Sequence, residues 1–210
     1  MAPILRHTAT LALLAALAAA IVATVQLTTR ERIATERRDA EQRPLLALLP
    51  QTPGTPLQLE TRQARADANV PGWEQPQRIF VARRNGEPVA VILPAGTEGY
   101  GGPLRLLVGI DATGRITGVQ VAAHRETPGL GDRIATDHGE WLRQFQGESL
   151  LHTPAAGWAV TSEQGEFDQL TGATITSRAA IAALQQALTY FATHRAELLG
   201  NASEDTVNER

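Results

Sequence analysis

Hydrophobic and polar residues alternate through the middle of the chain, in a pattern typical of paired β-strands. The stretch Arg78–Arg83 alternates around apolar side chains, and the Asn85-Gly86 pair after it is a strong signal for a tight hairpin turn. Pro88–Leu93 supplies the returning strand. A second pair follows at Leu104–Ile110 and Ile116–Ala122. These four segments predict a sheet built from antiparallel hairpins.

A helical period replaces this alternation near the C-terminal end. Apolar residues recur there at intervals of three, four and seven positions. They predict a helix from about Ser177 to Leu199 with one buried face. Thr176 or Ser177 can cap its start, and Gly200 can end it.

Two shorter elements are expected between the hairpins and this helix. A short helix fits His138–Phe145, and a strand fits Gly157–Thr161. Hairpin-paired strands with flanking helices define an α+β fold built on antiparallel sheet. The expected order along the chain is an N-terminal segment, a transmembrane helix, a juxtamembrane helix with a linker, one folded domain and a polar tail. These parts cover 1–7, 8–29, 30–70, 71–200 and 201–210.

The transmembrane prediction rests on an uncharged, alanine-rich run from Thr8 to Thr29. At about 1.5 Å per residue, this run makes a helix of roughly 33 Å, which is long enough to cross a bilayer. A cleaved signal peptide is the alternative, because small residues near Ala18–Ala20 are typical of a cleavage site. Arg6 precedes the run and several arginines from Arg30 onward follow it, so the flanking charges leave its orientation open.

Composition excludes several kinds of chemistry. The 210-residue chain has no cysteine, its only methionine is Met1, and all 19 of its basic residues are arginine. Disulfides, cysteine-ligated iron–sulfur clusters, thiol redox chemistry and lysine nucleophiles are therefore excluded. A net charge of -3 without a basic stripe argues against nucleic acid as a partner. An electron carrier of this composition needs a bound organic cofactor, or a metal held by histidines and carboxylates.

The histidines do not point to a metal site, and no catalytic residue is assigned. The five histidines show no metal-ligand spacing; they are His7, His124, His138, His152 and His194. Ser162 and Glu163 with His152 do not form the nucleophile–base pattern of a hydrolase. A stand-alone hydrolytic enzyme is therefore disfavoured.

The segment Asp168–Ser177 is the strongest candidate for a binding site. It places hydroxyl residues around Gly172 and Ala173, directly before the final helix. One interpretation is a capped helix entrance, because hydroxyl side chains are common there. The other is an anion site, since unpaired N–H groups and the helix dipole favour phosphate. Thr171 and Thr174 flank the two small residues in either case.

A second candidate is the glycine-rich segment His124–Asp132, which follows the last predicted strand. It can be a simple surface loop that joins a strand to a helix. It can also be a shaped platform, in which Leu130 packs against a flat ring and Glu126 and Thr127 supply polar contacts. Glycine-rich loops alone do not decide between the two.

Taken together, three stretches resemble the G subunit of the Rnf (Rsx) ion-translocating electron transport complex. They are Gly99–Leu104, whose turn positions Tyr100, His124–Ile134 and Phe167–Arg178. Less closely, they resemble the C subunit of the sodium-pumping NADH:quinone reductase, and the modest chain length favours the first family. The likeness runs from the N-terminal span to the last helix. Its most specific part is the string Asp-x-x-Thr-Gly-Ala-Thr that begins at Asp168.

This resemblance implies that Thr174 carries FMN as a phosphoester. In the family, the last threonine of the Thr-Gly-Ala-Thr motif is modified by a separate flavin transferase, which uses FAD and a metal ion. The string beginning at Asp168 serves that modification. Thr171 is then a local hydrogen-bonding group, and the other expected flavin contacts are Gly172, Ala173, Glu126, Thr127 and Leu130.

The resemblance also implies where and how the protein works. It predicts an electron-carrying subunit, not catalytic alone, of a complex that couples electron transfer to ion translocation. Its partners would be the other subunits of that complex. The chain would cross the bacterial inner membrane once, with its C-terminal domain in the periplasm. The alternative is a cofactor-free scaffold subunit, in which the threonine-rich loop only caps a helix.

Overall fold

The computed structural model describes residues 44–50, 56–64, 76–135 and 139–200, together with Ala15, Ala16 and Ala19. The chain divides into two compact units, Met1–Pro44 and Leu45–Arg210. The described residues include no helix that is both long and apolar enough to cross a membrane. The predicted span at 8–29 lies almost wholly outside the described residues, as does the predicted tail at 201–210.

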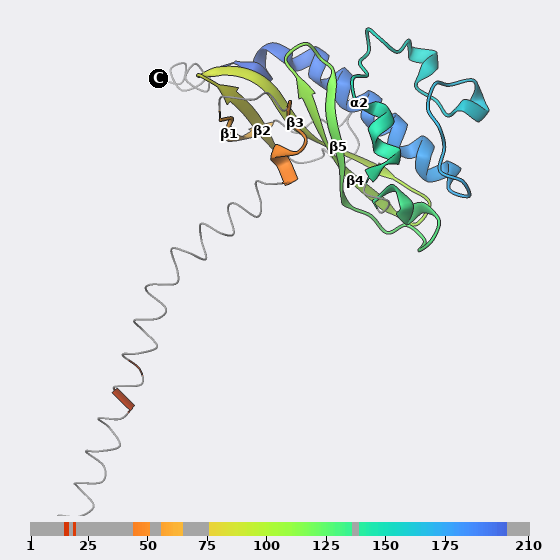
Figure 1. Ribbon diagram of the computed structural model, residues 1–210, viewed down its shortest axis with the longest axis horizontal. Helices are drawn as coiled ribbons and strands as arrows, with labels where there is room; N and C mark the ends of the chain where they lie inside the picture. Colours follow the sequence, from red (N-terminus) through yellow and green to blue (C-terminus); the bar gives the residue numbers. More distant parts are fainter. Residues whose placement is uncertain are drawn as a thin grey trace, which may run out of the picture. The chain divides into compact units, whose positions relative to one another are not determined.

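The second unit is built on one five-stranded antiparallel sheet, whose strands lie side by side in sequence order (Figure 1). The strands are β1 (Gln58–Ala64), β2 (Gln77–Arg84), β3 (Glu87–Glu98), β4 (Pro103–Asp111) and β5 (Ile116–Ala123). The four strands predicted from the alternating pattern are confirmed, as is the hairpin turn at Asn85-Gly86. The antiparallel α+β fold is therefore confirmed.

Strand β3 runs five residues beyond its predicted end at Leu93 and passes through Pro94. Proline lacks a backbone N–H and is normally restricted to strand edges. The pairing of β2 with β3 ends at Ile92, so β3 beyond that residue has β4 alone as its paired neighbour. Pro94 is therefore tolerated because this part of β3 is an edge on one side.

Strand β1 was not predicted and lies within the segment interpreted as linker. Its sequence is largely polar, and its side chains are mostly exposed or half-buried. It pairs with β2 along its whole length, from Gln58 opposite Arg83 to Ala64 opposite Gln77. An edge strand of this kind gains its stability from one ladder of backbone hydrogen bonds, so its sequence carries little hydrophobic pattern.

The long helix α2 (Thr174–Leu199) covers one face of the sheet and packs mainly over β3 (Figure 1). The main core lies between them. Its fully buried side chains include Ile181 and Leu184 of the helix and Val91 and Leu93 of β3. The predicted helix is confirmed, but its start is three residues earlier than Ser177.

The prediction of a hydroxyl cap at Thr176 or Ser177 is wrong. The N-cap position is Ala173, which makes no side-chain hydrogen bond, and both hydroxyl residues are buried within the first turn. Ser177 Oγ donates to the carbonyl of Ala173 at 3.1 Å and accepts from the N–H of Leu170 at 2.9 Å. The Ser177 hydroxyl therefore fixes the preceding loop. The Thr176 hydroxyl donates instead to Glu126.

Short 3-10 helices connect β5 to α2. They are η1 (Gly131–Ile134), η3 (Trp141–Phe145), η4 (Ala155–Gly157) and η5 (Thr161–Glu163). The helix expected at His138–Phe145 is present only as η3, and residues 136–138 lie outside the described part. The strand expected at Gly157–Thr161 is wrong. Only an isolated bridge joins Val160 to Phe167, because 3-10 turns on either side leave no room for an extended segment.

The other face of the sheet carries a smaller core. Leu45, Leu48 and Leu49 pack there against side chains of β2 and β3 such as Ala82 and Ile92. The hydroxyl of Thr117 on β5 donates to the carbonyl of Leu48 at 2.5 Å. Both faces of the sheet are thus at least partly covered, and this leaves one end of α2 and its neighbouring loops to form the candidate site.

Candidate functional site

A cavity of about 430 Å³ lies where three separate chain segments meet at the start of α2. The segments are the turn at Tyr100, the loop from Glu126 to Gly131 and the first residues of the helix. This volume is within the usual range for a small-molecule site, roughly 300–1,000 Å³. Six of the seven residues predicted to contact the flavin line it, namely Glu126, Thr127, Leu130, Gly172, Ala173 and Thr174.

Exposed apolar side chains concentrate at this cavity. In the described part of the chain, four large hydrophobic side chains are exposed: Tyr100, Leu130, Leu151 and Ile175. Three of them, all but Leu151, line the cavity. Solvent-exposed apolar groups gathered at one concave site are typical of a surface that binds a ligand. The sequence indicated Leu130 and the turn at Tyr100, but it gave no local signal for Ile175.

Unpaired backbone N–H groups face the same region. The first intrahelical bond of α2 is donated by Ser177 N to the carbonyl of Ala173 at 3.0 Å. Thr174, Ile175 and Thr176 precede it, and no described residue accepts a hydrogen bond from their N–H groups. Free N–H groups at a helix start, with the positive end of the helix dipole, form a site for an anion such as phosphate.

Thr174 occupies the first position of this helix and is half-buried in the cavity wall. Its hydroxyl makes no hydrogen bond to a described residue. Gly172, two positions earlier, has a φ of +80°, a conformation that side-chain-bearing residues rarely adopt. Leu130 packs close to this glycine, since its Cδ2 would lie 3.1 Å from a Cβ on Gly172.

The buried carboxylate of Glu126 bonds to both the turn at Tyr100 and the start of α2. Glu126 is 6% exposed, and its Oε2 accepts a hydrogen bond from the Thr176 hydroxyl at 2.7 Å. Its Oε1 accepts a longer one from the N–H of Gly101 at 3.4 Å. Gly131 packs so closely that an added Cβ would lie 2.5 Å from Glu126 Oε2. Glu126 therefore fixes the relative positions of the turn, the loop and the helix start.

Thr171, the seventh predicted residue, lies beside this cavity. With Asp168 it lines a neighbouring hollow of about 320 Å³, which also involves Trp141 and Gln144. Both Thr171 and Asp168 are exposed. The structure thus brings the predicted residues into one region, with Thr174 at the cavity and Thr171 on the outer side of the same loop.

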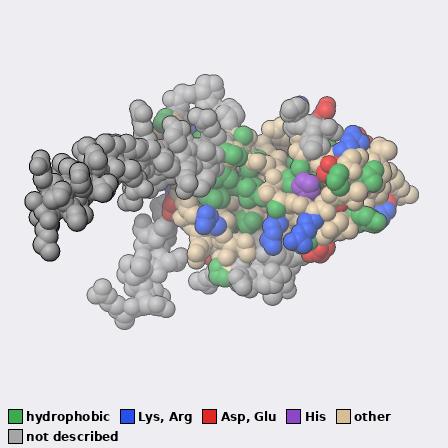
Figure 2. Space-filling view, turned by 90° about the horizontal axis from the view of Figure 1, so that it is seen from below, with side chains coloured by type: hydrophobic (Ala, Val, Ile, Leu, Met, Phe, Trp, Pro, Cys, Tyr) green, Lys and Arg blue, Asp and Glu red, His purple; other side chains and the backbone are tan. Residues whose placement is uncertain are grey.

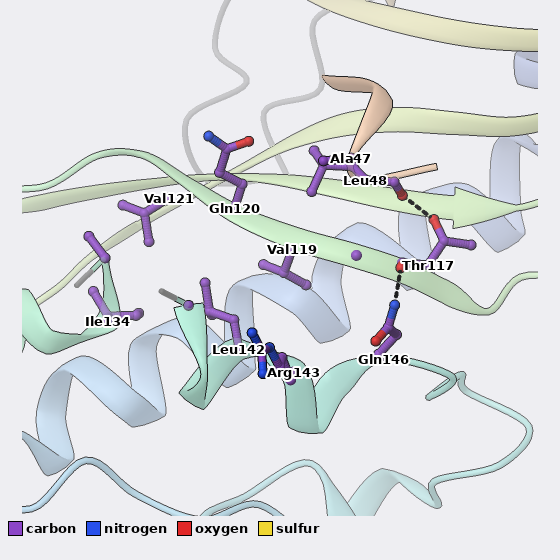
Figure 3. A pocket seen from close by; sticks show the side chains of 13 residues that line it. Ala47, Leu48, Thr117, Val119, Gln120, Val121, Ile134, Leu142, Arg143 and Gln146 are labelled. Atoms are coloured by element: carbon purple, nitrogen blue, oxygen red, sulfur yellow. Dashed lines mark hydrogen bonds between the residues drawn. The ribbon is translucent and has the colours of Figure 1, made fainter. Parts of the chain in front are cut away.

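A larger cavity, of about 510 Å³, lies between β5 and η3 and contains none of the predicted residues (Figure 3). Val119, Val121, Leu142 and Ile134 surround its apolar part. Near its other end, the Gln146 side chain donates to the carbonyl of Thr117 at 2.9 Å. This cavity lies between the sheet and the 3-10 helices that follow it. Neither a helix start nor an exposed aromatic ring is among its lining residues.

The charged side chains of the described residues give no second candidate. On the face shown in Figure 2, basic side chains lie among hydrophobic and neutral surface and form no continuous stripe. These are all arginines, since the chain contains no lysine. The described residues also include no group of three or more His, Cys, Asp or Glu side chains that could hold a metal ion.

Comparison with known proteins identifies the class of this domain. Residues 99–189, which include all three segments of the cavity, match the FMN-binding domain family. Residues 1–48 match the RnfG N-terminal region. Among solved structures, Shewanella oneidensis NqrC is 24% identical with a TM-score of 0.49, over 73% of this chain and 72% of that one.

The relatives in sequence identify the family. The G subunit of the ion-translocating oxidoreductase complex of Pseudomonas aeruginosa is 43% identical over 196 residues, which are 93% of this chain and 92% of that protein. The corresponding G subunit of Photorhabdus laumondii is 38% identical over 90% of each chain. This chain belongs to the family of G subunits of ion-translocating oxidoreductase complexes, the RnfG family.

Proposed function

We propose that this protein carries electrons within an Rnf complex on an FMN that is joined to Thr174 by a phosphoester bond. The observation that carries the proposal is the position of the Thr174 hydroxyl, which lies in the cavity wall beside three N–H groups without a described partner. An ester there places the negatively charged phosphate at the positive end of α2, where the helix field stabilises it.

The rest of the cavity fits the flavin ring system. Tyr100, Leu130 and Ile175 present exposed apolar surface to a flat ring, and Glu126 and Thr127 add polar groups at its edge. Leu130 is 45% exposed and Ile175 is 50% exposed, so the site is a shallow surface hollow. A shallow hollow buries little of a ligand, and a covalent bond keeps the flavin in place without a large contact area.

Attachment requires a group transfer that changes no oxidation state. Thr174 Oγ forms a bond to the phosphorus on the flavin side of FAD, and the bond from that phosphorus to the bridging oxygen breaks. AMP leaves with the bridging oxygen, and the hydroxyl proton passes to a base of the flavin transferase. The bound flavin then supplies one-electron chemistry, which the chain cannot supply itself because it has no cysteine and no haem-attachment motif.

The predicted membrane placement completes the proposal. The uncharged run at 8–29 anchors the chain once in the inner membrane, and the flavin domain lies in the periplasm beside the other subunits. The absence of cysteine makes orientation measurable. Leu151→Cys, at a side chain that is 94% exposed, is expected to react with an impermeant maleimide in intact spheroplasts. Labelling only after lysis would contradict the orientation.

The attachment site is tested by two matched substitutions. The full chain is expressed with its flavin transferase, and flavin fluorescence is read on a denaturing gel. Thr174→Val is expected to abolish the fluorescent band, while Thr189→Val, at an exposed threonine of the same helix outside the attachment loop, keeps it. Because the Thr174 hydroxyl has no described partner, its removal changes stability by about 0.5 kcal/mol or less. A fluorescent band in Thr174→Val would reject the assigned residue.

A further inference from the structure

Two side chains outside the flavin cavity hold the segment that leads to Thr174. Gln144 Oε1 accepts a hydrogen bond from the N–H of Asp168 at 2.8 Å, and Gln144 Nε2 donates to the Asp168 carbonyl at 3.3 Å. Trp141 Nε1 donates to the same carbonyl at 2.8 Å. Asp168 is thus held through its backbone by residues 24 and 27 positions earlier in the chain.

The element that supplies these side chains is firmly placed. Both belong to η3, and Gln144 Nε2 is oriented by a second bond to the carbonyl of Trp141 at 2.9 Å. Phe145, at the end of η3, is fully buried. Its ring lies 5.2 Å from the ring of Trp141 and 4.7 Å from that of Phe167, which directly precedes Asp168. The aromatic contacts therefore fix η3 against the start of the attachment loop.

The other end of the loop is tied to α2. The N–H of Leu170 donates to Ser177 Oγ at 2.9 Å, and the N–H of Ala173 donates to the carbonyl of Leu170 at 2.9 Å. Between these anchors, only Thr171 and Gly172 are exposed without a backbone bond to a described residue. The loop is therefore a short arch that is fixed at both ends, and Gln144 and Trp141 hold one of them.

The side chain of Asp168 is left accessible. It is exposed, and Gln144 and Trp141 bind only its backbone. The three residues line the hollow of about 320 Å³ on the outer side of the loop, together with Thr171. An enzyme that recognises the loop meets this hollow, and the conformation it meets is set by the bonds to the Asp168 backbone.

We propose that Gln144 and Trp141 are positioning residues for the modification of Thr174 by the flavin transferase. This inference rests on the proposed function. Their bonds hold the loop in the one conformation that presents Thr174 Oγ for transfer, so the transferase does not have to order the loop itself. A net hydrogen bond contributes about 1 kcal/mol, which corresponds to roughly fivefold in an equilibrium between ordered and disordered loops.

The experiment compares modification rates of full-length chains purified without cofactor. Each chain is incubated with the transferase, FAD and Mg²⁺, and flavin incorporation is followed over time. Gln144→Met removes both bonds from that side chain to Asp168, the second of them long at 3.3 Å, and is expected to lower kcat/KM about tenfold. Gln146→Met is its matched control, because Gln146 donates to Thr117 at the larger cavity and not to the loop (Figure 3).

A second pair of variants keeps the test independent of folding. Trp141→Phe keeps an aromatic ring against Phe145 but removes the indole donor. Trp158→Phe makes the same change at an indole that donates to Thr153 and also packs on Phe167. We expect kcat/KM to be about fivefold lower in Trp141→Phe and unchanged in Trp158→Phe. If Gln144→Met shifts Tm more than Gln146→Met does, the positioning role is judged from the comparison of Trp141→Phe with Trp158→Phe.

A local readout separates positioning from general stability. Hydrogen exchange at the Asp168 amide is expected to accelerate in Gln144→Met, while the amides of α2 keep their wild-type rates. Equal modification rates in each variant and its matched control would overturn the positioning role. A wild-type chain that the transferase does not modify would instead overturn the proposed function, so the two failures are distinguishable.

Discussion

The backbone groups at the two ends of α2 differ in whether side chains of the described residues bond to them. Past the C-terminal end, the carbonyl of Gly200 accepts hydrogen bonds from Arg62 Nη1 and Arg83 Nη2, each at 2.8 Å. At the N-terminal end, no described residue accepts from the N–H groups of Thr174, Ile175 and Thr176. Arginines from β1 and β2 bond to the chain just past one end of the helix, and the other end lines the cavity.

The unpaired end of α2 is therefore the functional candidate in a helix that is otherwise structural. Unpaired groups at a helix end are costly unless water or a ligand satisfies them, and native proteins rarely leave them without a partner. At the arginine end, the Gly200 carbonyl is bonded within the chain, so these bonds contribute to stability. The threonine end has donors available for an anion, and it is the end that carries Thr174, the proposed attachment residue.

The largest expected effect on stability lies at the threonine end. Thr176→Val removes the hydroxyl that donates to the buried Glu126 carboxylate at 2.7 Å. Hydrogen bonds to charged groups contribute more than neutral ones, so we expect about 2 kcal/mol lower free energy of unfolding. Urea unfolding of the cofactor-free chain measures this loss.

The matched control for that change lies on the same helix. Thr189 is exposed, and its hydroxyl donates to the carbonyl of Gln185 at 2.9 Å. Thr189→Val is expected to change the unfolding free energy by about 0.5 kcal/mol or less, as is usual for surface positions. Equal losses in the two variants would show that the Glu126–Thr176 pair does not hold the cavity together.

A smaller effect is expected at the arginine end. Arg62→Gln loses a charge-assisted bond to Gly200, and we expect about 1 kcal/mol lower unfolding free energy. Flavin incorporation at Thr174 is expected to keep its wild-type rate, because the change lies at the opposite end of α2. A variant with unchanged stability but slower incorporation would reverse the roles assigned to the two ends.

The smallest effect is a pH dependence at the same end. The hydrogen bond from Arg62, reinforced by Arg83, holds the pKa of Glu60 below its ordinary value of 4.5. A carboxyl with a lowered folded pKa contributes stability that is present above about pH 4.5 and is lost as the pH falls through the folded pKa. The Glu60 side chain is 35% exposed, so water and salt screen this contribution to below about 1 kcal/mol.

The measurement for this effect is the urea midpoint at neutral and acidic pH. Glu60→Gln is expected to lower the midpoint at neutral pH and to approach the wild type as the pH falls through the folded pKa of Glu60. Glu87→Gln, at an exposed position in the adjoining hairpin, serves as the matched change. A Glu60→Gln variant with the same deficit at both pH values would mean that the ion pairs do not contribute.

Parts of this fold could be predicted because their signals are local. The Asn85-Gly86 turn between alternating stretches defines its hairpin, and apolar spacing defines α2. β1 could not be predicted, since a polar edge strand carries almost no pattern. The strand expected at Gly157–Thr161 is absent for the opposite reason, because this segment has apolar residues but no extended structure. Apolar Trp158 and Val160 are buried there by 3-10 turns and aromatic packing.

The candidate site could be predicted as a set of motifs, while its geometry could not. Thr174 and Leu130 were assigned from sequence, and the fold brings them to one cavity. Thr176 was interpreted as a cap, yet its partner Glu126 is 50 positions away in the chain. Gln144, for the same reason, gave no signal, because its contact with Asp168 depends on how η3 packs against the loop.

The intact mass of the chain purified from its own cells shows whether FMN is joined to it covalently. We expect the mass of the polypeptide plus one FMN minus one water, and fragmentation that places the added mass on Thr174. An unmodified polypeptide, or an added mass on Thr171, would contradict the proposed attachment.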